Sequence, residues 1–246
     1  MTGWAGEDRS PCAIHYPSDQ GIAWQCRRLQ RGEGLEKLFG TRWRDVARFN
    51  RIDRRHAVPG REIKVPLRIE EVAEFTPLPR TYHGGVRGEK LILVDLTEQF
   101  LGAYEKGQLR FSLPIASGGA ENATPVGEFR ISAAHRTHRS CLYSIDHTDE
   151  PYPMHYALRF HINKEGVSYW IHGRDLPGFP ASHGCIGLSD EQMQAAYYGT
   201  PTFPLLEDAK MLYDWATEGL NETDSLQVLT NGPRVVIQGV APTSHR

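Results

Sequence analysis

The chain has 246 residues, of which 39% are hydrophobic and 24% charged, so it can bury one large core or two smaller ones. No run approaches the roughly 20 apolar residues that span a bilayer, and no apolar leader follows Met1, so neither a transmembrane segment nor a signal peptide is expected. The net charge is −2, but residues 1–70 hold 14 Lys or Arg against 9 Asp or Glu. This basic excess indicates either a solvated charged surface or binding to an anionic polymer. No nucleic-acid partner is expected.

After an N-terminal segment (residues 1–21), residues 22–68 carry strand, helix, helix and strand signals in that order. Strands are expected at residues 24–29 and 63–66, with helices between them and Gly40 as a helix stop. The order and the motif residues, at 32–35, 39–40, Asn50 and 59–66, resemble a LysM domain. The resemblance implies binding to N-acetylglucosamine polymers. Packing against the rest of the chain is the alternative.

Residues 69–87 are rich in proline and glycine and include Gly84 and Gly85, which indicates a linker or a segment that wraps a neighbour.

The four cysteines contain no C-x-x-C pair, so a structural zinc site is not expected. Cys12 and Cys26 can form a disulfide in an oxidising compartment. Cys141 has no motif around it and is interpreted as an inert thiol.

From residue 88 to residue 241, short apolar runs alternate with turn clusters, which predicts a mainly β domain. Strand patterns occupy residues 91–95, 156–160 and 234–238, and Ile171 leads directly into His172. Helical patterns follow at 190–198 and 205–218, with Ser189 as the expected N-cap of the first.

Two histidines and one cysteine form the most informative pattern, His172-Gly173 followed by Ser182-His183-Gly184-Cys185. A cysteine is a strong nucleophile as a thiolate, and a neighbouring imidazole is the usual group that removes its proton. The pattern therefore predicts an acyl-transfer centre. A zinc site built from both histidines and Cys185 is a rival interpretation, but no acidic residues cluster with them, and we expect neither a metal nor a cofactor.

This pattern resembles the signature of the L,D-transpeptidase (YkuD-type) family. Further matching elements are the strand at 91–95, the segment 99–104, Thr124-Pro125-Val126-Gly127 and the strand at 156–160. The resemblance covers roughly residues 88–240. It implies a β-sandwich or flattened barrel with a helix packed on it.

The resemblance also implies the roles of the site residues. Cys185 is the nucleophile and His172 the general base, oriented by the backbone carbonyl of Gly173, with Asp175 as an alternative orienting group. Backbone N–H groups around Gly184 and Cys185 form an oxyanion hole. His183 donates a further hydrogen bond or holds the loop.

Ser182 is expected to shape the turn before the cysteine and lies in the substrate region. Met154 and Tyr156 are expected to line the cleft, with core packing as the alternative, and Arg159 is a candidate for a substrate carboxylate or for a structural ion pair. One position departs from the family: Gly187 stands where an Arg or Asn is usual. That departure leaves donor and acceptor preference open.

The resulting hypothesis is a cysteine acyltransferase of the cell envelope or periplasm that acts on peptidoglycan stem tetrapeptides. Cys185 releases D-Ala, and the acyl group passes to an amine. Three alternatives remain: hydrolysis of the same thioester, a wall-binding protein with little catalysis whose LysM-like unit binds glycan strands, and the same fold acting on a non-murein substrate.

Overall fold

The computed structural model describes residues 10–84, 89–145, 148–221 and 223–243. The first nine residues of the expected N-terminal segment lie outside this part of the chain. The same holds for Gly85 to Gly88, at the expected end of the linker.

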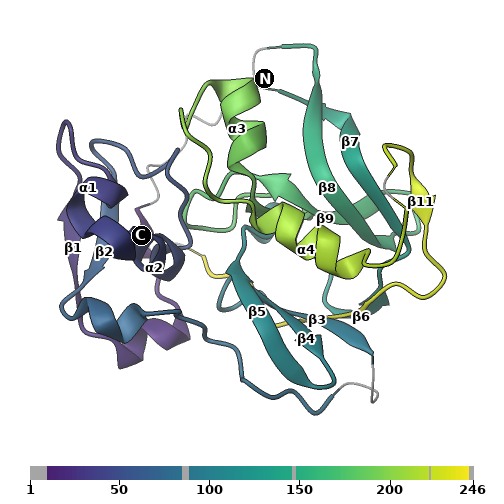
Figure 1. Cartoon of the computed structure of the whole chain (residues 1–246), viewed down its shortest axis with the longest axis horizontal. Helices are drawn as coiled ribbons and strands as arrows, with labels where there is room; N and C mark the ends of the chain where they lie inside the picture. Colours follow the sequence, from purple (N-terminus) through teal and green to yellow (C-terminus); the bar gives the residue numbers. More distant parts are fainter. Residues whose placement is uncertain (1–9, 85–88, 146–147, 222, 244–246) are drawn as a thin grey trace.

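Two five-stranded sheets form the larger part of the molecule (Figure 1). One has the strand order β10-β9-β8-β7-β11 and the other β5-β4-β3-β12-β6. The first sheet consists of β7 (Ala133–Ser144), β8 (Pro151–Ile162), β9 (Ser168–Arg174), β10 (Ile186–Ser189) and β11 (Gln227–Val228). The second consists of β3 (Lys90–Asp95), β4 (Phe100–Glu105), β5 (Gln108–Pro114), β6 (Gly127–Arg130) and β12 (Arg234–Gln238).

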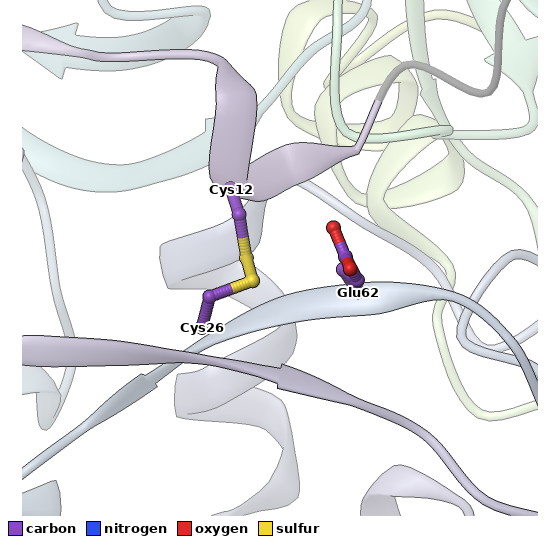
Figure 2. Close-up of side chains that lie close together, drawn as sticks. All are labelled: Cys12, Cys26 and Glu62. Atoms are coloured by element: carbon purple, nitrogen blue, oxygen red, sulfur yellow. A yellow bond between two sulfur atoms is a disulfide. The ribbon is translucent and has the colours of Figure 1, made fainter.

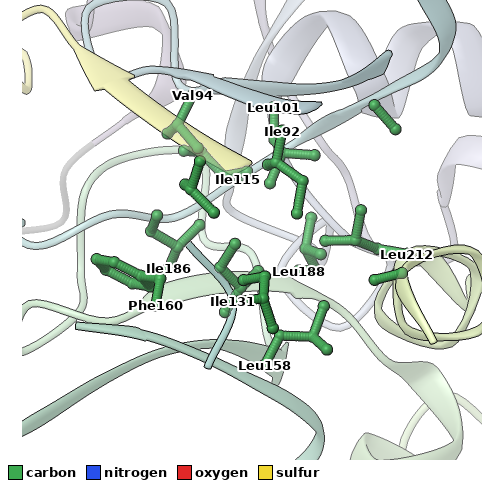
Figure 3. Packing of buried hydrophobic residues seen from close by; sticks show 14 of the residues in the cluster. Ile92, Val94, Leu101, Ile115, Ile131, Leu158, Phe160, Ile186, Leu188 and Leu212 are labelled. Atoms are coloured by element: carbon green, nitrogen blue, oxygen red, sulfur yellow. The ribbon is translucent and has the colours of Figure 1, made fainter. Parts of the chain in front are cut away.

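The main hydrophobic core lies between these two sheets (Figure 3). Ile92 and Leu101 come from the second sheet, whereas Leu158, Ile171 and Ile186 come from the first, and all five are fully buried. Alternation along each strand places these apolar side chains on the inner faces. The sandwich confirms the mainly β fold expected from the sequence.

Two helices follow the first sheet, α3 (Glu191–Tyr198) and α4 (Asp208–Ala216). The buried face of α4, including Leu212 and Tyr213, joins the core cluster, so this helix covers the sandwich. The expected N-cap of α3 is wrong by one residue. The side chain of Asp190 accepts the hydrogen bond from the backbone N–H of Met193, while Ser189 still belongs to β10. Among the described helices, none is long and apolar enough to cross a membrane.

The N-terminal unit has the expected order of strand, helix, helix and strand. It contains β1 (Trp24–Arg28), α1 (Leu35–Phe39), α2 (Trp43–Asn50) and β2 (Glu62–Pro66), and β1 pairs antiparallel with β2. Gly40 caps the C-terminus of α1, as expected. Its own small core includes Val46 and Ile63.

A disulfide joins Cys12 to Cys26, which confirms the pairing that the sequence allowed (Figure 2). The bond attaches the N-terminal segment to the first strand of the N-terminal unit. Within that segment, the hydroxyl of Tyr16 donates to the carbonyl oxygen of Gly178, 162 residues later in the chain. The N-terminal segment therefore also contacts the loop that precedes Cys185.

The segment after β2 wraps the sandwich. It begins with a 3-10 turn at Ile69–Val72, and Val72, Phe75 and Leu78 are buried together with Phe100 of the second sheet. These contacts favour the interpretation of this stretch as a wrapping segment over its interpretation as a linker.

The N-terminal unit is fixed to the sandwich by buried ionic hydrogen bonds. Arg51, whose side chain is fully buried, pairs with Asp19 at 3.1 Å and with Glu98 at 3.2 Å. Asp53, also fully buried, accepts hydrogen bonds from the backbone N–H of Leu176 at 2.6 Å and from Nε2 of Gln194 at 2.9 Å. Because buried charges are costly unless they are paired, these contacts specify how the two parts dock.

We predict that Asp53→Ala lowers the free energy of unfolding by about 3 kcal/mol, because the change leaves buried donors on both parts of the chain without an acceptor. Urea unfolding monitored by circular dichroism measures the change. Asp214→Ala is the control, since this carboxylate is exposed and, within the described part of the chain, its ion pair is with Lys210 in the same helix. A loss no larger than that of the control would contradict the prediction.

Candidate active site

Strand pairing places His172 and Cys185 on one face of the sheet. β10 runs parallel to β9, and Ile186 is the partner of Ile171. Both isoleucines point into the sandwich core. Because neighbouring side chains on a strand point to opposite faces, His172 and Cys185, each next to one of these isoleucines, both point away from the core. The register thus brings together two side chains that lie thirteen positions apart in the sequence.

A pocket of about 830 Å³ opens on this face and is lined by both side chains. Its walls come from the end of β7 and the start of β8, from the loop between β9 and β10, and from the N-terminal unit. The lining side chains include Met154, Tyr152, Tyr143, Ser182, His183, Arg174, Asp175, Arg55, His56 and Arg61.

His172 is held as a neutral base. Its Nδ1 lies 2.8 Å from the carbonyl oxygen of Gly173, which is the contact that the resemblance implied. A carbonyl only accepts, so Nδ1 carries the proton and Nε2 is left with a free lone pair. Burial lowers the pKa of His172 to about 3, and the hydrogen bond to Gly173 opposes that shift.

Cys185 packs against Met154 and Trp170 in a small apolar cluster. Burial raises the pKa of its thiol to about 11, although a backbone hydrogen bond at Trp170 and the charge of Arg174 act in the opposite direction. With the pKa of the thiol far above that of the imidazole, the resting pair is a neutral thiol and a neutral imidazole. Proton transfer must therefore accompany attack on a substrate.

The loop before Cys185 is fastened by the Thr-Pro-x-Gly element. The hydroxyl of Thr124 donates to the carbonyl oxygen of Gly184 at 2.9 Å and accepts from the backbone N–H of Gly118 at 2.9 Å. Gly184 has φ +107°, and a Cβ there would lie 2.8 Å from the ring of Tyr169. Only glycine fits this backbone conformation and this close approach. The motif therefore fixes the backbone on which Cys185 stands.

The other two residues of the motif have different surroundings. The backbone N–H of Ser182 donates to the carbonyl oxygen of Ser117, and Ser182 is buried at the pocket wall. His183 is exposed, and its ring stacks on Tyr143 at 4.5 Å between centroids. His183 thus faces the pocket next to the β7–β8 hairpin.

Three further candidates lie in different places. Tyr156 packs on the sandwich core, 5.8 Å from the ring of Tyr213, and Arg159 lies over Trp170 and bonds to Ser132; neither is among the described residues that line the pocket. Asp175 lines the pocket, where its carboxylate pairs with arginines.

Gly187 leaves room for an arginine from the neighbouring strand. A Cβ at this position would lie 1.8 Å from Cδ and 2.1 Å from Cγ of Arg174. The side chain of Arg174, two residues beyond His172, therefore lies directly over Gly187. A polar side chain therefore does lie at this position, two residues after Cys185, but it is Arg174 from β9.

Several pocket residues escaped the sequence analysis. Tyr152, whose ring edge approaches His172 with 6.4 Å between centroids, lies in β8 two residues before Met154, and strand alternation from Met154 is the signal that predicts it. Arg55, His56 and Arg61 belong to the basic N-terminal unit and approach the pocket only through the tertiary fold. For these three, the sequence carries no local signal.

In the described part of the chain, possible metal ligands gather at Cys12, Cys26 and Glu62 (Figure 2). The two cysteines are joined in the disulfide, so their sulfur atoms are not available as thiolate ligands.

Comparison with protein families identifies a catalytic domain. The family model described as the L,D-transpeptidase catalytic domain (YkuD) matches residues 89–237. No curated protein matches the sequence. A solved L,D-transpeptidase from Stackebrandtia nassauensis is similar to this chain with a TM-score of 0.42 and 23% identity. The similarity covers 64% of this chain and 58% of the Stackebrandtia chain. Residues 123–326 of an L,D-transpeptidase from Xylanimonas cellulosilytica have a TM-score of 0.43 and 19% identity, with 79% of each chain covered.

We predict that alkylation of Cys185 by iodoacetamide is slow at pH 7 and rises about tenfold per pH unit up to roughly pH 10, because the raised pKa leaves little thiolate at lower pH. Mass spectrometry of digested protein measures the rate, with the exposed Cys141 quantified in the same samples. A rate plateau between pH 5 and pH 8 that His172→Asn abolishes would instead reveal a preformed thiolate–imidazolium pair and refute the prediction.

Proposed function

Because the chain belongs to the L,D-transpeptidase (YkuD) family, we propose that it is a cysteine acyltransferase acting on peptidoglycan stem tetrapeptides. The observation that carries the proposal is the pairing of β9 with β10, which presents Cys185 and a neutral His172 to one pocket. A nucleophile beside an oriented base is the arrangement that acyl transfer requires.

In the proposed acylation, Cys185 Sγ attacks the carbonyl carbon of the bond between residue three and D-Ala while Nε2 of His172 takes the thiol proton. The tetrahedral intermediate then collapses, the C–N bond breaks, and His172 returns the proton to the leaving amine of D-Ala. A thioester on Cys185 remains. Because the resting pair is neutral, the proton moves as the S–C bond forms.

The oxyanion of the intermediate needs donors, and we assign them to the backbone N–H groups around Gly184 and Cys185. Support comes from the way Thr124 and Gly118 hold the backbone at Gly184. Each preorganised donor of this kind contributes roughly 3–4 kcal/mol in the transition state.

In the second step an amine of a neighbouring stem attacks the thioester, loses its proton to His172 and releases the Cys185 thiol. If water attacks instead, the same site acts as an L,D-carboxypeptidase or endopeptidase. We favour the amine as acceptor because the family model describes a transpeptidase domain.

Location in the cell envelope or periplasm follows from this substrate. Glycan strands are a further proposed partner, through the LysM-like N-terminal unit. The support for that partner is the βααβ order of the unit together with its motif residues; the family match begins only at residue 89 and so does not cover it.

We predict that the protein, incubated with a disaccharide-tetrapeptide, releases D-Ala and carries an acyl adduct on Cys185. Intact-mass spectrometry detects the adduct and chromatography identifies cross-linked dimers or tripeptides. Cys185→Ala abolishes the adduct, and His172→Asn slows its formation by about 10²–10⁴-fold because the base is lost. If neither the tetrapeptide nor a carbapenem modifies the parent protein, the proposed function fails.

For the N-terminal unit, we predict that the Cys185→Ala variant co-sediments with insoluble peptidoglycan from which stem peptides have been removed by amidase. The variant excludes covalent capture, and the stripped glycan excludes binding through the catalytic pocket. Sedimentation at two salt concentrations separates specific binding from charge attraction, which weakens as salt rises. No retention at moderate salt would refute glycan binding and leave packing as the role of the unit.

A further inference from the structure

One carboxylate at the rim of the catalytic pocket is shared by three cationic side chains. Asp175 pairs with Arg55 at 2.9 Å, with Nε2 of His56 at 3.2 Å and with Arg174 at 3.4 Å. Arg174 and Asp175 follow His172 in the chain, whereas Arg55 and His56 belong to the N-terminal unit. Two separate parts of the chain thus build this cluster.

The cluster has more positive than negative charge. Among the described residues, a second carboxylate contacts it: Asp53 lies behind His56 with an Oδ1–Nδ1 distance of 2.9 Å. Burial opposes the charge on His56, but the two carboxylates outweigh it and raise its pKa to about 9, so His56 is a cation at neutral pH. Three cations against two carboxylates leave a net charge of about +1.

The cluster is open to the pocket. The side chains of Arg174, Asp175, His56 and Arg55 are 15%, 16%, 22% and 28% exposed, and all four line the cavity. The carboxylate of Asp175 accepts hydrogen bonds from Nη1 of Arg55 and Nη2 of Arg174, and its backbone carbonyl oxygen accepts one from Nε of Arg174. Among the described residues, Nη2 of Arg55 and Nη1 of Arg174 have no hydrogen-bond acceptor.

The same cluster lies next to the reacting atoms. Arg174 lies over Gly187, and Gly187 is two residues from Cys185 and opposite His172 in the strand register. A ligand group held by Arg174 therefore lies close to the bond that Cys185 attacks. Guanidinium groups with free N–H donors match the planar geometry of a carboxylate.

We propose that Arg174 and Arg55, held in place by Asp175, bind a carboxylate of the stem peptide beside the scissile bond. This inference rests on the proposed function and adds one specificity determinant, Arg55, from outside the family match. Two carboxylates of a tetrapeptide donor flank the scissile bond: the C-terminal carboxylate and, where residue three is a diamino diacid, the carboxylate of its side chain. The arms of the test separate them.

The test compares three donors with the full-length protein: a tetrapeptide with both carboxylates free, the same peptide amidated at its C-terminus, and the same peptide amidated on the residue-three side chain. The rate of acyl-enzyme formation gives kcat/KM for each. We expect amidation of the recognised carboxylate to lower kcat/KM by about 10–100-fold, in line with the loss of charge-assisted hydrogen bonds.

Variants connect that discrimination to the cluster. The measure is the ratio of kcat/KM for the donor with the free carboxylate to kcat/KM for the amidated donor. Arg55→Met lowers this ratio toward one, and Arg55→Lys keeps part of it. Arg42→Gln, which changes an exposed arginine elsewhere in the N-terminal unit, leaves the ratio unchanged. Gly187→Ala displaces the side chain of Arg174 and also reduces the ratio. An unaltered rate of Cys185 alkylation by iodoacetamide confirms that the pocket of Arg55→Met is folded.

Equal turnover of all three donors by the parent protein overturns the proposal. It is also overturned if Arg55→Met slows all three donors by the same factor, since a purely structural role predicts that result. Failure of the proposed function has a different signature, because then no donor acylates Cys185 in any variant.

Discussion

Parallel pairing of β9 with β10 is the constraint on which the candidate site depends. It directs Ile171 and Ile186 into the sandwich core and their neighbours, His172 and Cys185, to the opposite face. A shift of one residue in either strand would exchange core and pocket side chains, and burial of the isoleucines opposes such a shift. The hydrophobic core and the geometry of the reacting pair are therefore maintained by the same contacts.

Burial has two opposing effects at this site. It shields the thiol and the imidazole from bulk solvent, which strengthens the electrostatic interactions between groups in the pocket. It also disfavours both charged forms, so the pKa of Cys185 is raised and that of His172 is lowered. The hydrogen bond between His172 and the carbonyl of Gly173 keeps the imidazole correctly oriented without introducing an anion. A carboxylate in that position would stabilise the imidazolium but would add a buried charge close to the apolar cluster around Cys185.

Local patterns predicted most of the secondary structure and the motif residues, because alternation, helical spacing and glycine stops are short-range signals. Ser189 was wrong as the cap of α3 because the next residue, Asp190, has the longer reach to the helix N-terminus after β10 has ended. Met154 and Ser182 in the pocket wall were predicted, but the part of the wall that comes from the N-terminal unit could not be. Arg55 is one of many arginines in a basic stretch, and its partner Asp175 lies 120 residues further along the chain. Likewise, the apparent gap at Gly187 has meaning only once Arg174 is seen to occupy it.

The buried carboxylate of Asp53 has a consequence for dissecting the protein into parts. A fragment cut where the family match begins, at residue 89, would keep Cys185, His172 and the sandwich core but would lose Asp53 and Arg51. The backbone N–H of Leu176, in the loop between β9 and β10, and the carboxylate of Glu98, in the turn between β3 and β4, would then lose these partners. The minimal unit that preserves this pocket therefore starts within the N-terminal segment, so the segment matched by the family model and the segment that folds as a functional whole are different stretches of chain.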